Sequence, residues 1–176
     1  MPVIRKFGSL AVGSALAAAV LVPILTATPA LAAKDGDKFG DWTVSCPKAP
    51  ANAPASASTC RLMQIEKIKG SDGKEVAVLK AAIFHLNDKE YVLFGYLPLG
   101  YAIPPGVKVS VDGGKEYELF PQRCIPQGCE AANKIDAEML AALKKGANAK
   151  IEFHIVDKVG TIAVSLKGLS EGLTKF

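Results

Sequence analysis

The chain has 176 residues, 49% of them hydrophobic and 22% charged, with a formal net charge of +4. This length is sufficient for one ordinary domain with a buried core. The net charge does not indicate nucleic-acid binding, because the sequence has no Lys- or Arg-rich run and no alternation of arginine with aromatic residues.

The first 33 residues have the three parts of a secretory signal peptide. Arg5 and Lys6 precede the uncharged run "LAVGSALAAAVLVPIL", and Ala30 and Ala32 fit the small-x-small pattern that signal peptidase recognises. An uncleaved membrane anchor is the alternative, but about 16 apolar residues are fewer than the roughly 20 that a span needs. Removal of residues 1–33 lowers the net charge from +4 to +2, because Arg5 and Lys6 are the charged residues there. We therefore expect a periplasmic, secreted or outer-surface protein with no transmembrane segment after cleavage.

Four cysteines in an exported chain predict disulfides, and their spacing favours local pairing among the three pairings that are available. The cysteines are Cys46, Cys60, Cys124 and Cys129. A bond around the Ala-, Pro- and Ser-rich segment after Cys46 would stabilise the fold by about 3 kcal/mol on the chain-entropy model. Zinc sites and redox motifs are the alternatives, but zinc-binding cysteines stand closer together than the first pair, and "CIPQGC" is longer than C-x-x-C. We expect no metal and no cofactor.

Short stretches with alternating apolar residues follow one another after the signal segment and predict β-strands. "WTVSC" places Trp42 and Val44 on one face, after a polar, glycine-rich lead-in at 34–41 that we expect to be mobile. "VKVSV" and "EYELF" flank "DGG", and Asp-Gly between alternating strands predicts a tight hairpin turn with positive φ. The expected strands lie at 42–46, 60–69, 76–85, 91–97, 107–111, 116–120, 149–156 and 160–166. The side chains expected to point inward from the strand at 149–156 are Ile151, Phe153 and Ile155.

One segment has the period of a helix instead. "DAEMLAALKKG" begins with Asp136 as an N-cap residue and stops at Gly146. Its apolar stripe consists of Met139, Leu140 and Leu143. A second, short helix is expected in 167–176, although two glycines weaken that prediction.

These elements predict a mainly β fold in a single domain at 34–176. Seven or eight strands with one or two short helices are best accommodated by an antiparallel β-sandwich, Ig-like or jelly-roll-like. A partly closed barrel is the second choice.

The sequence shows no pattern that indicates catalysis. It has no G-x-S-x-G, no H-E-x-x-H and no phosphate-binding glycine loop. His85 and His154 are interpreted as ordinary strand residues rather than general bases. Ser165 with Lys167 would make a Ser/Lys dyad, but a solvated strand face explains the pair equally well. We therefore expect no catalytic residues and a protein that is not an enzyme.

The apolar loop "YLPLGYAIPPG" allows two interpretations. It either caps one end of the domain, or it presents Tyr96, Leu99, Tyr101 and Ile103 to a partner on a proline-stiffened surface. Replacement of the second and third of these residues by serine separates the interpretations, since a cap is needed for folding and a contact surface is not.

Five motifs of the chain, taken together and in this order, resemble the invasion-associated locus B family of exported proteobacterial proteins. They are "FGDWTVSC", "PLGYAIPPGVKVSVDGG", "RCIPQGCEA", "MLAALKKG" and "VSLKGLSEGL". The resemblance implies a periplasmic or surface-associated β-sandwich with the pairings Cys46–Cys60 and Cys124–Cys129. The family is named for host-cell invasion and brings no established catalytic residues.

The leading hypothesis is a disulfide-stabilised, non-catalytic envelope protein that acts through contacts with a protein or a cell surface, in host-cell invasion and virulence or in envelope adaptation. The alternative is a periplasmic module that binds a small ligand or lipid, with the apolar loop covering a pocket. A hydrolase that uses Ser165 or a histidine is a third hypothesis. Neither nucleic acid nor a cofactor is expected as a partner.

Overall fold

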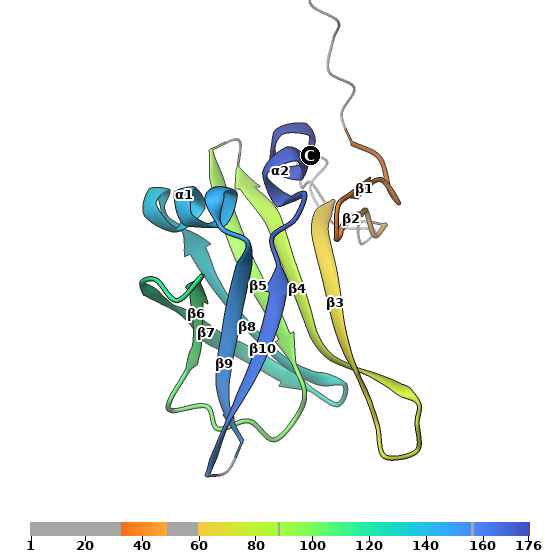
Figure 1. Cartoon of the computed structure of the whole chain (residues 1–176), viewed down its shortest axis with the longest axis vertical. Helices are drawn as coiled ribbons and strands as arrows, with labels where there is room; N and C mark the ends of the chain where they lie inside the picture. The colour runs from red at the N-terminus through yellow and green to blue at the C-terminus, as the bar shows by residue number, and fades with distance from the viewer. Residues whose placement is uncertain (1–32, 49–59, 88, 156) are drawn as a thin grey trace, which may run out of the picture.

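The structure is a computed structural model that describes residues 33–48, 60–87, 89–155 and 157–176 (Figure 1). The predicted signal peptide lies outside these residues except for its last position. The strands are β1 Lys38–Phe39, β2 Trp42–Ser45, β3 Arg61–Lys69, β4 Glu75–Asn87, β5 Glu90–Leu97, β6 Val107–Val111, β7 Glu116–Ile125, β8 Gly128–Ile135, β9 Asn148–Ile155 and β10 Lys158–Ser165. The helices are α1 Ala137–Lys145 and α2 Leu169–Lys175.

The strands form one antiparallel sheet in the order β1-β2-β3-β4-β5-β8-β7-β6-β9-β10. The predicted mainly β, antiparallel fold is confirmed. The predicted division into two sandwiched sheets is not, because the sheet is continuous and open and has ten strands in the described residues. The long strand β7 keeps its two halves joined: Glu116–Leu119 pairs with β6, and Phe120–Ile125 pairs with β8.

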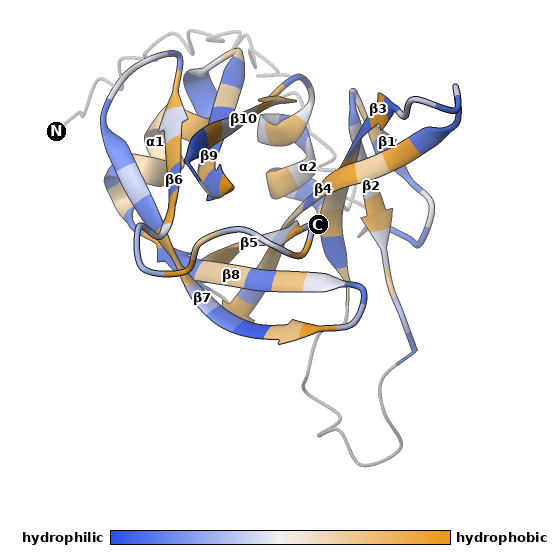
Figure 2. Ribbon diagram, turned by 90° about the horizontal axis from the view of Figure 1, so that it is seen from below, coloured by the Kyte–Doolittle hydropathy of each residue, from blue (hydrophilic) through white to orange (hydrophobic). Residues whose placement is uncertain are grey.

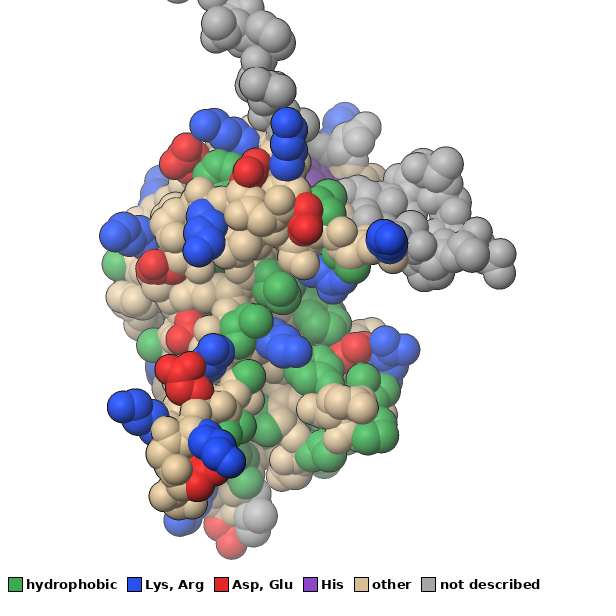
Figure 3. Space-filling view, turned by 90° about the vertical axis from the view of Figure 1, so that its right-hand side faces the viewer, with side chains coloured by type: hydrophobic (Ala, Val, Ile, Leu, Met, Phe, Trp, Pro, Cys, Tyr) green, Lys and Arg blue, Asp and Glu red, His purple; other side chains and the backbone are tan. Residues whose placement is uncertain are grey.

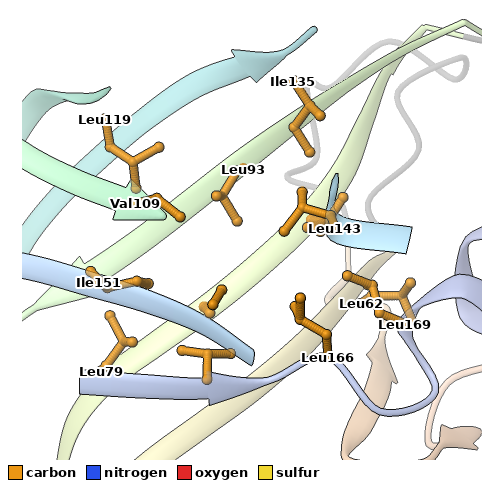
Figure 4. Packing of buried hydrophobic residues seen from close by; sticks show 14 of the residues in the cluster. Leu62, Leu79, Leu93, Val109, Leu119, Ile135, Leu143, Ile151, Leu166 and Leu169 are labelled. Atoms are coloured by element: carbon orange, nitrogen blue, oxygen red, sulfur yellow. The ribbon is translucent and has the colours of Figure 1, made fainter. Parts of the chain in front are cut away.

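The sheet curls strongly, so that β9 and β10 lie opposite β4 and β5 (Figure 2). Inward side chains from both halves therefore meet in one hydrophobic core. Leu79 and Leu93 of the first half pack in the same cluster as Val109 and Ile151 of the second (Figure 4). Each fully buried aliphatic side chain contributes about 1.5–3 kcal/mol, so this shared core is the main force that holds the curl.

The two outer ends of the sheet come together although no ladder joins them in the described residues. The indole Nε1 of Trp42 donates a 2.9 Å hydrogen bond to the carbonyl oxygen of Ser165, at the end of β10. The backbone N–H of Asp41 donates to the carbonyl oxygen of Lys167 at 3.1 Å. The first strands are thus fastened to the chain between β10 and α2.

The lead-in at 34–41 is ordered, which corrects the prediction that it is mobile. The side chain of Asp35 accepts a 2.7 Å hydrogen bond from the backbone N–H of Cys46. The side chain of Phe39 is buried in the core. The prediction failed because the segment is polar in composition. Its order depends on the single buried residue Phe39 and on the turn that Asp35 and Gly36 form against β2.

Two local predictions of turn and helix ends are confirmed. Asp112 and Gly113 have φ values of 47° and 75°, as a tight Asp-Gly turn requires. The side chain of Asp136 accepts a 2.7 Å hydrogen bond from Met139 N–H and so caps α1. Leu140, expected in the apolar stripe of this helix, is only half-buried.

Strand β8 was not predicted, and one inward position was wrong. "GCEAANKI" has small and polar residues with little β propensity, yet its Ala131 is fully buried between β5 and β7. Ile155 is 41% exposed, because it stands at the end of β9, where it pairs with Lys158 of β10 and, on its other side, only with Tyr101 through a single bridge. No helix in the described part of the chain is long and apolar enough to span a bilayer.

Candidate functional site

The two histidines lie at opposite ends of the molecule and do not form a common site. His85 is close to the β4–β5 hairpin, where its ring packs at a tilt against the rings of Tyr91 and Phe176, with centroid distances of 4.4 and 5.1 Å. His154 is close to the β9–β10 hairpin, at the other end of the sheet (Figure 1). His85 therefore serves the packing of the chain's last residue against the sheet.

Ser165 and Lys167 do not meet as a dyad through their side chains. The hydroxyl of Ser165 accepts a 3.2 Å hydrogen bond from the backbone N–H of Lys167. The side chain of Lys167 is exposed. The serine thus stabilises the turn between β10 and α2. In the residues that the structure describes, no group of three or more His, Cys, Asp or Glu side chains is arranged to hold a metal ion.

All four cysteines are in disulfides, with the local pairing that their spacing favoured. Cys46–Cys60 joins the end of β2 to the start of β3 around the segment at 49–59, which is outside the described residues. Cys124–Cys129 crosses the β7–β8 hairpin. Both bonds hold neighbouring strands together.

Of the four residues proposed for the contact loop, one is buried, two are exposed, and Tyr96 is half-buried within strand β5. Tyr101 points into the core, is 6% exposed and meets Phe153 edge to face. Burial raises the pKa of its hydroxyl, which has no hydrogen-bond partner in the described residues. Leu99 and Ile103 are 54% and 52% exposed. Tyr101 therefore caps the core, whereas Leu99 and Ile103 are exposed, and their presentation to a partner stays a prediction.

A groove lies where β4 continues beyond the end of β5, partly on the face of the sheet opposite to the core and partly at the open edge of β4. We call it the outer groove; it consists of two adjoining pockets that share Lys80 and Tyr96. The edge pocket has a volume of about 330 Å³ and is lined by Val76, Ala77, Val78, Leu79, Lys80, Tyr96, Leu97, Pro98, Leu99 and Gln127. The face pocket has a volume of about 260 Å³ and is lined by Ser45, Arg61, Met63, Lys80, Ala82, Phe94, Tyr96 and Glu130. Apolar side chains gather around a hollow on this face (Figure 3).

The period of the strands explains why apolar residues line both pockets. Ala82, Phe94 and Tyr96 alternate with the core residues of β4 and β5 and so point to the outer face. Ala82 is nevertheless only 3% exposed, because its larger neighbours cover it. The floor of the face pocket is thus a packed apolar surface.

Basic groups stand over this apolar floor. The Nζ of Lys80 lies 5.3 Å from the centre of the Tyr96 ring, within the range of a cation–π contact. Glu130 is bound by Arg123, whose Nε donates to it at 2.6 Å, and this hydrogen bond raises the pKa of Arg123. Arg61 and Lys80 form no ion pair with a carboxylate of the described residues. Since the carboxylate of the pocket is neutralised, the groove favours a partner with an anionic group.

Sequence reasoning found Tyr96 and Leu99 but missed the other side of the groove. Lys80 and Val76 lie in a segment, 76–85, whose pattern is ambiguous between helix and strand. No local pattern shows that the first half of this strand pairs with β3 on one side and with no described strand on the other. A usable signal was Pro98, which has no N–H and so ends the pairing of β5.

Comparisons with known proteins all identify invasion-associated proteins as similar to this chain. The family described as "Invasion associated locus B (IalB) protein" matches residues 42–176. Two proteins named invasion protein B homologs, from Brucella abortus strain 2308 and from Brucella abortus biovar 1 strain 9-941, are each 27% identical over 141 residues, which is 79% of this chain and 77% of theirs.

A solved structure adds to the match in fold. The crystal structure of invasion associated protein b from Bartonella henselae superposes with a TM-score of 0.65 at 22% identity, over 78% of this chain and 91% of that one. Because the family match covers well over half of the sequence and the resemblance of the five motifs points the same way, the chain belongs to the invasion associated locus B family.

Proposed function

We propose that the protein is an exported envelope protein, stabilised by disulfides, that works by binding a protein or cell-surface partner and catalyses no reaction. The outer groove is the observation that carries this proposal. It combines exposed Val76 and Leu99 with the basic side chains of Arg61 and Lys80, and contiguous exposed apolar surface with polar groups at its rim is typical of interaction sites. The two disulfides are consistent with an oxidising compartment.

The relatives supply the biological setting of the proposal. Their names refer to invasion. We propose a role in host-cell invasion or in adaptation of the cell envelope for this chain as well, with the groove as the contact surface.

Site-specific photo-crosslinking in living cells tests the proposal. A photoreactive phenylalanine derivative placed at Leu99 is expected to capture an envelope or host-surface protein. The matched control carries the same group at Val159, which is as exposed as Leu99 (55% and 54%) but lies on the β9–β10 hairpin. Equal capture from both positions, or a reduced protein found in the cytosol, would contradict the proposal.

A small-ligand or lipid-binding module is the second candidate, and the face pocket is the observation that favours it. Its packed apolar floor and two basic side chains would suit an amphipathic anion. Native mass spectrometry of protein isolated from cells separates the candidates: a retained small molecule supports this one, and an empty chain supports the first.

A further inference from the structure

We propose that the open edge of β4 at Glu75–Leu79 accepts an extended peptide of the partner as an additional strand, and that a carboxylate side chain of this peptide binds Lys80 and Arg61. The inference rests on the proposed function and specifies the chemistry of its partner: an extended segment that alternates apolar side chains and carries Asp or Glu.

The backbone of β4 has a free side at this edge. On one side, Glu75 pairs with Lys69, and the ladder with β3 continues along the strand. On the other side, the ladder with β5 ends where Lys80 pairs with Tyr96. No described strand pairs with Glu75–Leu79 on that side.

The hydrogen-bond pattern of the β3–β4 ribbon identifies the groups that face outward. Gly70 N–H donates to the carbonyl oxygen of Lys74 at 2.8 Å, so these two residues are a hydrogen-bonded pair. Hydrogen-bonded and non-hydrogen-bonded pairs alternate along an antiparallel ladder. Val76 therefore bonds to β3, while the N–H and C=O groups of Glu75 and Ala77 point to the open side.

The space beside this edge suits a strand. An added strand would lie about 4.8 Å from β4, on the line that β5 leaves at Pro98. That position is the edge pocket of about 330 Å³. Its walls are the apolar side chains of Val76 and Leu99, which would contact alternate side chains of the peptide.

This edge has few of the features that prevent strands from pairing with other chains. The segment "EVAVL" contains no proline and two β-branched residues. Its irregularity, where Val78 is skipped in the pairing with β3, lies beyond Glu75–Ala77, and its charged residue Glu75 is already paired with Lys67. The other end of the sheet differs, because Trp42 and Asp41 bond to the carbonyl groups at the end of β10. A β-prone edge that pairs on one side only, beside an apolar pocket, is a good site for strand addition.

The basic side chains beside the edge indicate that the partner peptide carries an acidic residue. Arg61 and Lys80 are basic groups without an ionic partner among the described residues, and both line the face pocket next to the edge. The acidic residue of the edge, Glu75, is paired with Lys67 at 3.1 Å. A peptide carboxylate would therefore bind the cations Arg61 and Lys80 at one end of the groove. At the other end, the ion pair of Lys67 and Glu75 is already neutral.

Selection from a phage-displayed library of short random peptides, with the oxidised protein as target, tests the inference. Enriched sequences should alternate apolar residues and contain Asp or Glu. Ala77→Pro removes the outward N–H, whereas the matched control Ala77→Val keeps it and favours the strand. We expect Ala77→Pro to weaken binding of the best peptide about tenfold or more and Ala77→Val to change it less than about twofold, as measured by fluorescence anisotropy.

Two further measurements keep the test independent of folding. Lys80→Gln should weaken the same peptide about two- to fivefold, and Lys158→Gln on the β9–β10 hairpin should not. If Ala77→Pro lowers thermal stability, N-methylation of alternate residues of the peptide replaces it: one register should abolish binding and the other should not. Hydrogen exchange of the Ala77 amide should slow in the complex.

The outcomes are distinct. Enriched peptides that bind Ala77→Pro as tightly as the native chain, or a library that yields no alternating acidic sequences, would overturn strand addition. If crosslinking from Leu99 in cells persists in Ala77→Pro, strand addition fails while the proposed function stands. If Leu99 captures no partner in either form, the proposed function itself fails. A small molecule retained by protein isolated from cells, together with a library that yields no binding peptide after its removal, would overturn the inference in favour of the second candidate.

Discussion

Gly40 and Gly168 face each other where the start of the sheet meets the chain between β10 and α2. Both have positive φ, 57° and 85°. A Cβ at Gly168 would lie 2.2 Å from the carbonyl oxygen of Phe39, and one at Gly40 would lie 2.3 Å from that of Lys167. Only residues without a side chain allow the two backbones to approach in this way.

Gly168→Ala is therefore expected to destabilise the protein by about 3 kcal/mol or more, since left-handed strain adds to a backbone clash. Gly36→Ala is the matched control, because Gly36 also has positive φ (87°) but no atom within 4 Å of the added Cβ. The control should cost only about 1 kcal/mol. Denaturant unfolding of both variants checks the prediction, and equal losses would contradict it.

Tyr101 and Leu99 separate the two roles of the apolar loop. Tyr101→Ser should cost about 3–5 kcal/mol because it empties a core position beside Phe153. Tyr101→Phe should be neutral or stabilising, since the hydroxyl is buried without a partner in the described residues. Leu99→Ser should change stability by less than about 0.5 kcal/mol. Thermal unfolding measures all three, and a large loss in Leu99→Ser would show that the whole loop is structural.

The sequence predicted that the apolar loop has a role, but it could not predict which residues of the loop are exposed. Leu99 and Tyr101 are two apolar residues in one irregular loop, and no period tells which of them points inward. The bridge from Tyr101 to Ile155 decides it, and this contact joins residues far apart in the chain.

Among the elements, the β6–β7 hairpin has its turn fixed from outside the hairpin. The carboxylate of Asp112 accepts hydrogen bonds from the backbone N–H groups of Ala147 and Asn148, at 2.8 and 2.9 Å. These bonds lower the pKa of Asp112. The turn is thereby tied to the start of β9.

This pKa predicts how stability depends on acid. The folded state binds fewer protons than the unfolded state as pH falls, so the contribution of Asp112 is present above its unfolded pKa of about 3.9 and is lost below it. Asp112→Asn keeps an acceptor and tolerates the positive φ but does not titrate. Its stability should fall less steeply between about pH 4 and 2 than that of the native chain, as measured by urea unfolding at each pH; parallel curves would contradict the prediction.

The two disulfides stabilise elements to different degrees. Their sequence separations are 14 and 5 residues. On the chain-entropy model the longer loop contributes about 3 kcal/mol and the shorter about 2 kcal/mol. Replacement of Cys46 and Cys60 by serine should therefore lower the midpoint of denaturant unfolding more than replacement of Cys124 and Cys129. The reverse order would mean that packing around the β7–β8 hairpin outweighs loop entropy.

Element prediction succeeded where side chains alternate clearly and failed where residues are small. Val107, Val109 and Val111 identify β6 without further information. Strand β8 alternates less clearly, with Cys129, Ala131, Asn133 and Ile135 at the corresponding positions, and is defined by its neighbours β5 and β7. Long-range pairing of this kind overrides local propensity, so sequence patterns alone could not assign it.

For the whole molecule, the pattern of short strands predicted antiparallel β structure but not how the strands divide. The sandwich was expected because about eight strands usually pack as two sheets. The structure keeps one open sheet, since β7 extends far enough to pair on both halves. The length of β7 was hidden by Pro121, which breaks the apparent strand after Phe120 and coincides with an irregularity of the register.

The hydrogen bond from Trp42 to Ser165 makes the intrinsic fluorescence of the tryptophan sensitive to the contact between the two ends of the sheet. Trp42 is the single tryptophan of the chain, and it is almost completely buried at the point where the first strands reach the last one. Separation of these ends would admit water to the indole and shift its emission to longer wavelength. The emission wavelength of Trp42, followed during titration with a partner, would thus show without any label whether binding separates the two ends of the curled sheet.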